Sequence, residues 1–176
     1  MVPDYPDLES IFDLYYRDVY HFSLFYTNNK QEAEDITQET FLKVMKNISQ
    51  LKDYSKVKTW IFSIAKNTAI DIQRKQKLIN YIPKLLHHAE SPPSTNDLDK
   101  ELIRQEYWQL LQTALLKLKP HYRRIIILRG IKEFSVKETA EILECTELKI
   151  RVDYHRGLQL MKKHLSGLDE RWAIHE

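Results

Sequence analysis

Residues 52–75, KDYSKVKTWIFSIAKNTAIDIQRK, combine the types of side chain that bind a nucleic acid strand. Lysine and arginine cations can neutralise phosphates, aromatic rings can stack on bases, and an amide can hydrogen-bond a base edge. An alternative interpretation is a protein core that holds the rings beside an ordinary solvated face of lysines, and composition alone favours neither. The candidate strand contacts are Tyr54, Lys56, Lys58, Trp60, Lys66, Asn67 and Arg74.

An acidic cluster lies directly before this basic stretch. Between residues 43 and 75 eight basic residues outnumber two acidic ones, whereas Glu32, Glu34, Asp35 and Glu39 precede them. For Glu32 and Glu34 the positive end of a helix dipole is an adequate explanation. The opposite charges of the two segments nevertheless indicate two different partners.

A third group of candidate residues follows a helix-turn-helix pattern near the C-terminus. Ser135 and Glu138 have the spacing of a capping box, which marks the start of a helix. Residues 144–146 form a short turn before a second helix, and such a helix lies in the major groove with its N-terminal residues toward the bases. A plain helical hairpin with a charged outer face is the alternative. The exposed candidates are Thr146, Glu147, Lys149, Arg151, Asp153 and Arg156.

The elements that position these groups are helices. Apolar residues recur at three- and four-residue steps along most of the chain, which is the period of an amphipathic helix. Only three glycines are present, and several of the six prolines fall between the periodic segments. Helices are predicted at about 8–27, 31–48, from Thr59 to 75, 99–118, 121–130 closed by Gly130, 135–143 and 147–165.

The composition predicts an all-α chain of two small helical domains joined by a flexible linker, the C-terminal domain containing the helix-turn-helix. The linker is expected within 77–100, where HHAESPPSTND has a loose composition. The adjacent pair His87 and His88 has no third ligand nearby, and Cys145 is the only cysteine, so neither a metal site nor a disulfide is expected. We expect no cofactor, no signal peptide and no membrane insertion, and a cytoplasmic location.

The stretch Trp60-Ile61-Phe62-x-Ile64-Ala65-Lys66-Asn67-Thr68-Ala69-Ile70-Asp71-x-x-Arg74 resembles the helix of bacterial sigma factors that melts promoters and reads their -10 element. The likeness is to the extracytoplasmic-function (ECF) group of the sigma-70 family. It implies -10 DNA contacts for the candidates between Tyr54 and Arg74. The loop at 49–58 corresponds to the family segment that accepts a base flipped out of the -10 strand, and extruding a base costs a few kcal/mol.

Residues 33–43, AEDITQETFLK, are similar to the segment with which sigma factors grip the clamp helices of the RNA polymerase largest subunit. The resemblance implies polymerase contacts for Asp35, Gln38, Glu39 and Leu42. Their spacing is compatible with such docking, because these four positions share one face of a helix.

The second half resembles the -35-binding domain of the same family, through Leu110-Leu111-x-x-Ala114-Leu115-x-x-Leu118, Arg123-Arg124-x-Ile126-x-Leu128 and His155-Arg156-Gly157-Leu158. It implies -35 contacts for Thr146, Lys149, Arg151 and Arg156. Three positions depart from the family. Glu144 replaces a frequent glycine, which suggests a less strained turn; Asp153 could accept from a cytosine amino group; and Val152 replaces Ser or Thr.

The implied assignment is a region 2 domain at 1–76, a linker at 77–100 and a region 4 domain at 101–176. Its function would be to direct core RNA polymerase to promoter DNA without performing chemistry, under the control of an anti-sigma factor. A stand-alone helix-turn-helix regulator is the alternative, but it leaves the acidic face at 35–42 and the stretch 52–75 without a role. An enzyme using His21 and Asp35 is a third possibility with nothing to set its geometry.

Overall fold

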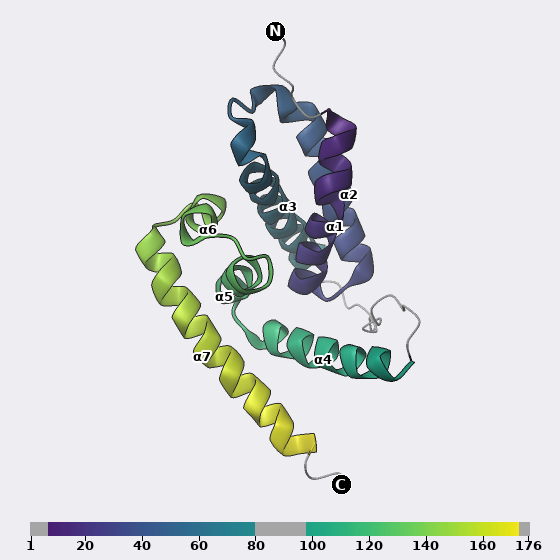
Figure 1. The fold of residues 1–176 in the computed structure, drawn as a ribbon, viewed down its shortest axis with the longest axis vertical. Helices are drawn as coiled ribbons and strands as arrows, with labels where there is room; N and C mark the ends of the chain where they lie inside the picture. Colours follow the sequence, from purple (N-terminus) through teal and green to yellow (C-terminus); the bar gives the residue numbers. More distant parts are fainter. Residues whose placement is uncertain (1–6, 80–97, 173–176) are drawn as a thin grey trace.

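The computed structural model describes residues 7–79 and 98–172, and its described part consists of helices and short connections without a strand (Figure 1). This confirms the all-α prediction. The elements are α1 (Leu8–Thr27), α2 (Lys30–Asn47), the 3-10 helices η1 (Ile48–Gln50) and η2 (Tyr54–Lys56), α3 (Val57–Ile79), α4 (Leu98–Lys117), α5 (Pro120–Ile126), the π-helix η3 (Ile127–Ile131), α6 (Val136–Leu143) and α7 (Glu147–Trp172).

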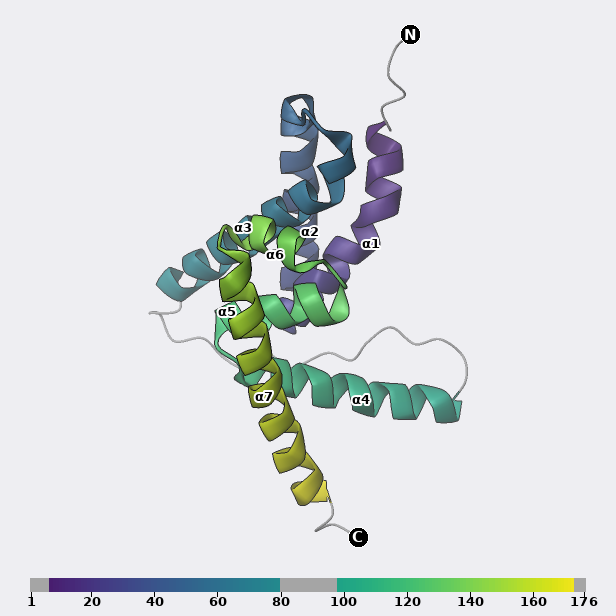
Figure 2. The same cartoon turned by 60° about the vertical axis from the view of Figure 1, so that its left-hand side comes forward.

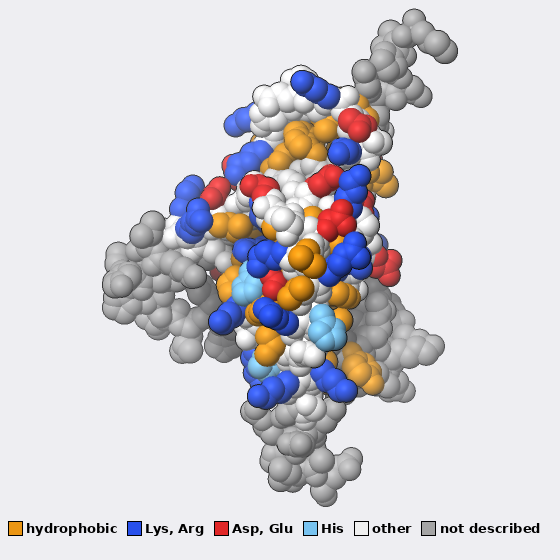
Figure 3. All heavy atoms as spheres, turned by 90° about the vertical axis from the view of Figure 1, so that its left-hand side faces the viewer, with side chains coloured by type: hydrophobic (Ala, Val, Ile, Leu, Met, Phe, Trp, Pro, Cys, Tyr) orange, Lys and Arg blue, Asp and Glu red, His pale blue; other side chains and the backbone are white. Residues whose placement is uncertain are grey.

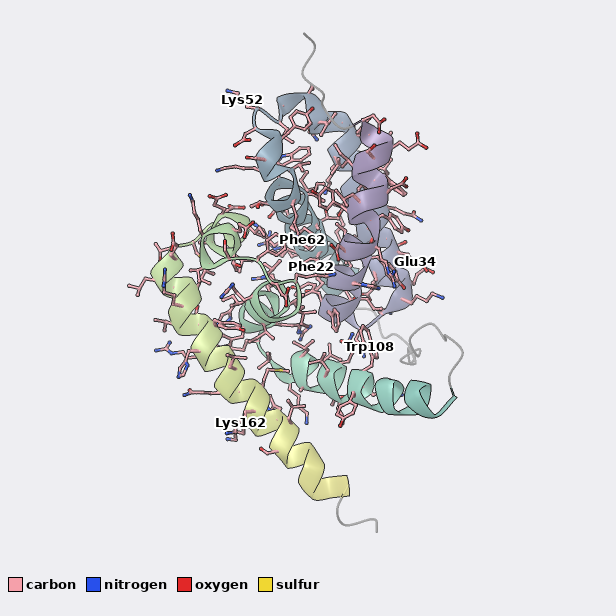
Figure 4. All side chains as sticks on the ribbon, in the orientation of Figure 1. Phe22, Glu34, Lys52, Phe62, Trp108 and Lys162 are labelled. Atoms are coloured by element: carbon pink, nitrogen blue, oxygen red, sulfur yellow. The ribbon has the colours of Figure 1, made fainter. Side chains whose placement is uncertain are left out.

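Helices α1, α2 and α3 pack together as an N-terminal domain. Phe22 and Phe62 are both fully buried, and their rings meet edge to face with centroids 5.7 Å apart (Figure 4). Between α1 and α2 the chain turns at Asn28, which has a left-handed backbone (φ 53°), and Asn29 accepts a hydrogen bond from the Glu32 amide as the N-cap of α2. The predicted boundaries of both helices are therefore confirmed within about one residue.

The connection between α2 and α3 is more ordered than the sequence indicated. Asp53 accepts hydrogen bonds from the amide and hydroxyl of Ser55, at 3.0 and 2.6 Å, and so caps η2. Because η2 leads straight into the next helix, α3 begins at Val57, two residues before the predicted start at Thr59. Of its predicted apolar stripe, Ile61, Ala65 and Thr68 are buried, and Ile64 and Ile72 are half-buried against the core.

In the C-terminal domain, the prediction that Gly130 closes the helix at 121–130 is wrong. Gly130 lies inside the π-helix η3 and does not have a positive φ; the chain turns instead at Glu133, with φ 57°. A Cβ built on Gly130 would come within 3.5 Å of the Tyr154 hydroxyl. That distance is an ordinary van der Waals contact, so packing against Tyr154 of α7 does not require glycine at this position.

The helix-turn-helix has the predicted capping box, since Ser135 and Glu138 bond each other's backbone amides at 3.1 and 2.7 Å. The expectation of a relaxed turn is wrong. Glu144 has φ 54° and ψ 48°, a left-handed conformation that favours glycine and is costly for other residues. The turn therefore keeps the backbone that glycine would adopt, with a carboxylate on it.

The two domains contact each other, with α3 beside α6 and α1 beside α4 in both views (Figures 1 and 2). Phe62 of α3 meets Phe134 with ring centroids 4.7 Å apart, and Phe25 of α1 meets Trp108 of α4 at 4.5 Å. One buried apolar cluster runs through both domains. Residues 80–97, with most of the predicted linker and the pair His87 and His88, lie outside the described residues.

Among the residues that the structure describes, no helix is long and apolar enough to cross a membrane. The same residues contain no group of three or more His, Cys, Asp or Glu side chains that could hold a metal ion.

Arg123 of α5 joins the domains from a buried position. Its guanidinium donates to the carbonyl oxygens of Leu115, Leu116 and Leu118 at the end of α4 and to that of Tyr26 at the end of α1, the last at 2.8 Å. Burial lowers the pKa of Arg123 below its ordinary value, and the hydrogen bonds compensate the charge.

We expect Arg123→Met to lower the free energy of unfolding by about 3 kcal/mol, because it leaves buried carbonyl oxygens without a donor. Denaturant unfolding followed by circular dichroism measures this. Arg151→Met, which changes an exposed arginine, is the control and should stay within about 0.5 kcal/mol of the natural chain. Equal effects of the two substitutions would contradict the anchoring role of Arg123.

Candidate protein and nucleic-acid surfaces

The four residues predicted to contact a protein partner lie in one groove between α2 and α3. The groove has a volume of about 560 Å³. Asp35, Gln38, Glu39 and Leu42 line its α2 side, and Asp71, Ile72, Arg74 and Lys75 line its α3 side with Lys43 and Thr68 between them.

The α2 wall of the groove carries Asp35 and Glu39, and the α3 wall carries Arg74 and Lys75 beside Asp71. Lys43 bridges the two walls, since its amine lies 3.7 Å from Glu39 and donates to the Thr68 hydroxyl at 3.1 Å. Leu42 is 50% exposed, and Met45, one turn further along α2, is exposed as well. Exposed apolar side chains rimmed by charges are typical of a surface that binds another protein.

Arg74 was predicted to contact DNA, but it lies in this groove with the predicted protein contacts. It comes from the last third of α3, two helical turns beyond Asn67. The structure thus separates Arg74 from the other candidates of the stretch 52–75.

A second hollow, of about 330 Å³, lies at the start of α3. Lys56 and Trp60 are the only predicted strand contacts that line it, and Trp60 is half-buried with part of its surface against the core. Tyr54 packs against the same core and does not line the hollow. The other lining residues are Gln50, Leu51, Lys52, Asp53, Thr59, Ser63 and Glu141.

Sequence reasoning missed the polar side chains of this hollow. Gln50 lies before the basic stretch, and Ser63 lies three residues after Trp60 on the same side of α3; their amide and hydroxyl are groups that read base edges. Glu141 comes from α6 of the other domain, so no local signal could have placed it here. Lys52, also in the lining, projects outward from the connection before α3 (Figure 4).

Three predicted DNA-binding lysines contact the C-terminal domain. The Lys56 amine lies 3.6 Å from the Glu141 carboxylate, and the Lys66 amine donates to the Glu144 carboxylate at 2.7 Å. The Lys58 amine lies over the Phe134 ring, 4.7 Å from its centroid. Lys66 is only 6% exposed, and its hydrogen bond holds the pKa of Glu144 below the ordinary glutamate value. Asn67 and Arg74 are exposed.

On α7 the predicted -35 contacts lie at the free surface. Lys149 and Arg151 are exposed and form ion pairs one turn apart on the same helix, with Asp153 at 2.6 Å and Glu147 at 3.1 Å. Arg156 is exposed, and the Thr146 hydroxyl accepts from the Lys149 amide at 3.2 Å at the start of the helix. Asp153 is 5% exposed, so the suggestion that it accepts from a cytosine does not hold in this structure.

Two apolar residues on this helix are exposed, of which the sequence analysis named only Val152, as a departure from the family. Leu148 is 71% exposed and Val152, one turn later, is 41% exposed. Methyl groups on the face of a recognition helix can contact the methyl group of thymine. Figure 3 shows Lys, Arg and His side chains with hydrophobic ones between them over the lower part of this face, whereas most of its Asp and Glu side chains lie further up among Lys and Arg.

Comparisons with known proteins agree on one family. Residues 11–79 match Sigma-70 region 2, and residues 108–161 match Sigma-70, region 4. The ECF RNA polymerase sigma factor SigX of Bacillus subtilis is 31% identical over 168 residues, which cover 91% of this chain and 84% of SigX. SigM of the same organism is 31% identical over 88% of this chain and 93% of its own length.

Among solved structures, the chain is similar to the sigma factor RpoE from Bartonella quintana, solved in complex with the anti-sigma factor NepR. The TM-score is 0.76 at 22% identity, with 91% of this chain and 97% of RpoE covered. This likeness shows that the fold is shared.

The capping box makes the stability of the helix-turn-helix depend on pH. Hydrogen bonds from Ser135 lower the pKa of Glu138 below its ordinary value of 4.5. A carboxyl group with a lowered pKa stabilises the fold above its unfolded-state pKa, and this contribution is lost as the pH falls through the folded-state value. Near neutral pH, Glu138→Ala should therefore lower the melting temperature, and the difference from the natural chain should shrink toward zero in acid. Thermal unfolding at several pH values tests this; a difference that stays constant would contradict it.

Proposed function

The chain belongs to the ECF sigma factors of the sigma-70 family, which direct RNA polymerase to promoters, and we propose that its separate surfaces divide this work. The groove between α2 and α3 docks on core polymerase. The hollow at the start of α3 and the lysines around it hold the -10 strand, and the exposed face of α7 holds the -35 element. As a sigma factor, the chain is an initiation factor and not an enzyme.

The observation that supports polymerase docking most directly is the common groove of Asp35, Gln38, Glu39 and Leu42. Their spacing alone only places them on one face of a helix. In the structure, that face stands opposite basic residues of α3, so the partner meets charges of both signs and an apolar centre at Leu42. A mixed surface of this kind sets the register of a docked helix pair. We assign Arg74 to this surface as well as to the -10 strand.

The hollow lined by Trp60 fits the capture of one flipped base. An aromatic ring for stacking, an amide at Gln50 and a hydroxyl at Ser63 are groups that recognise an extruded base. Stacking at about 1 to 3 kcal/mol per base can offset the cost of unstacking it. Lys56, Lys58 and Lys66 then neutralise phosphates on either side, and Tyr54 supports the loop from the core.

For the -35 element, α7 enters the major groove through its first turns. The guanidinium groups of Arg151 and Arg156 hydrogen-bond guanine. Lys149 and Thr146 contact phosphates. Leu148 and Val152 contact thymine methyl groups. The domain limits 1–76, 77–100 and 101–176 remain our proposal for the division of labour.

An anti-sigma factor is the further partner that we propose, since the RpoE structure contains one. A cytoplasmic location is proposed on the same basis of family membership. The stand-alone regulator is not supported, because residues 11–79 match a sigma-70 region that such a regulator does not need.

Docking is tested by Asp35→Arg combined with Gln38→Ala, which reverses one charge and removes one amide in the groove. The variant should lose co-elution with sigma-free core RNA polymerase at physiological salt, while its circular dichroism spectrum stays unchanged. Asp13→Arg, the same charge reversal on an exposed site of α1, is the matched control and should bind as the natural chain does. Undiminished binding of the first variant would overturn the docking assignment.

Base recognition by α7 is tested by Arg151→Ala. If Arg151 reads a base edge, the loss should amount to about 1 to 3 kcal/mol and be confined to one position of the -35 element. Affinities of the polymerase complex for a set of single-base promoter variants measure this, with Arg17→Ala, an exposed arginine of α1, as the control. A uniform loss over all variants would show a phosphate contact instead.

A further inference from the structure

The acidic end of α6 contacts the surface that we assign to the -10 strand. Glu141 and Glu144 are one turn apart, and both carboxylates face lysines of the N-terminal domain, Lys56 and Lys66. We propose that this end of α6 takes the place of the strand's phosphates, so that the chain without polymerase keeps its -10 surface covered while its -35 surface stays free. The proposal rests on the -10 assignment above.

Lys66 of α3 is held in the contact with the end of α6. Its amine is almost completely buried, and a buried ammonium is stable only with a partner that compensates the lost hydration. That partner is Glu144, 78 residues away along the chain. A DNA strand cannot reach Lys66 in this arrangement. Separation of the domains would leave Lys66 exposed and without its counter-charge, which is the state that attracts a phosphate.

The backbone of Glu144 provides a second, independent observation. A left-handed residue between two helices is normally glycine, because other residues pay a conformational cost there. The chain instead has a side chain at this position that reaches across to α3. The pKa of Glu144 is held low mainly by the Lys66 hydrogen bond, so the carboxylate is charged when the contact is formed.

Glu141 contacts a second part of the surface. It lines the hollow that would receive the flipped base and lies 3.6 Å from the Lys56 amine. A carboxylate at the edge of the hollow repels the phosphate of an incoming nucleotide. The apolar contact of Phe134 with Phe62, and the Lys58 amine over the Phe134 ring, hold α6 in place.

The other two surfaces remain accessible. The docking groove lies between α2 and the far part of α3, and none of its lining residues comes from α6. Lys149, Arg151 and Arg156 on α7 are exposed. Polymerase can therefore dock before the domains separate. Single-strand binding is coupled to docking through the loss of one contact, the one between α6 and α3.

The test compares single-stranded DNA binding by two full-length double variants. Glu141→Gln with Glu144→Gln removes both carboxylates from the lysines. Glu133→Gln with Asp13→Asn makes the same change in net charge at exposed positions outside the contact between α6 and α3. Fluorescence anisotropy with a labelled single-stranded oligodeoxynucleotide of mixed sequence, in the absence of polymerase, gives the affinities.

The first variant should bind about tenfold more tightly than the natural chain, and the control should differ little from it. Each lysine released to a phosphate steepens the dependence of log affinity on log salt by about 0.7, so two lysines should add about 1.4. Equal affinities and equal slopes for the two double variants would overturn the proposal.

Glu144→Gly is a second variant that removes the same carboxylate in a different way. Glycine accepts the left-handed backbone without cost, which offsets part of the stability lost when the buried Lys66 loses its counter-charge, so this variant should stay folded and bind the strand more tightly than the natural chain. A variant that is folded by circular dichroism but shows no gain in strand affinity would overturn the covering role of Glu144.

A last comparison separates this proposal from the -10 assignment itself. In complex with core polymerase, Lys56→Gln with Lys66→Gln should weaken binding of the non-template -10 strand. If it does so while the carboxylate variant shows no gain, the covering contact is overturned and the -10 surface stands. If strand binding in the complex does not depend on these lysines, the -10 assignment is overturned, and the covering proposal falls with it.

Discussion

Helix α3 has to satisfy two demands at once, and the rest of the structure follows from how it does so. Its apolar stripe must be buried, and Ile61, Phe62 and Ala65 are fully covered by α1, α2 and the segment before α6. Its cations cannot be buried without partners. The helix therefore lies with one side in the core and presents lysines along the others, where each must find water, DNA or a carboxylate.

The ring of Phe62 is the point at which the two domains meet. It contacts Phe22 within the N-terminal domain and Phe134 from the C-terminal domain, both edge to face. Around this aromatic centre, Arg123 ties the end of α4 to the end of α1, and Lys132 pairs with Asp18 at 2.6 Å. The contact between the domains is thus partly apolar and partly ionic, a composition compatible with separation when a partner competes for the charged groups.

The surfaces that we propose are arranged in a way that suits promoter opening. The docking groove and the base hollow lie at different parts of α3, and the -35 face lies on α7, so one partner need not displace another. In our proposal, the -10 surface is the one that the chain itself covers. Single-stranded DNA is also the ligand that should be bound last, after the duplex has been located and polymerase is in place.

Local spacing determined much of this protein. Period and composition predicted the helices, the Ser135–Glu138 capping box predicted the start of α6, and the positions 35, 38, 39 and 42 predicted one face of α2. These features depend on residues within one or two helical turns, where the period of the helix fixes which side chains are neighbours. The left-handed Glu144 and the turn at Glu133 were not predicted, because the sequence does not show which non-glycine residue will bear a positive φ.

Only the tertiary structure decided where the charged residues act. It buried Lys66 against Glu144, placed Glu141 in the hollow beside Trp60, placed Arg74 in the groove between α2 and α3 and paired the buried Asp153 with Lys149. The positions of Lys66, Glu141 and Arg74 follow from how α3 lies against its neighbours. Asp153 is buried because α7 turns that face toward the core. No pattern along the chain encodes such a meeting of surfaces, because it is set by the shapes and apolar areas that two folded domains bury together.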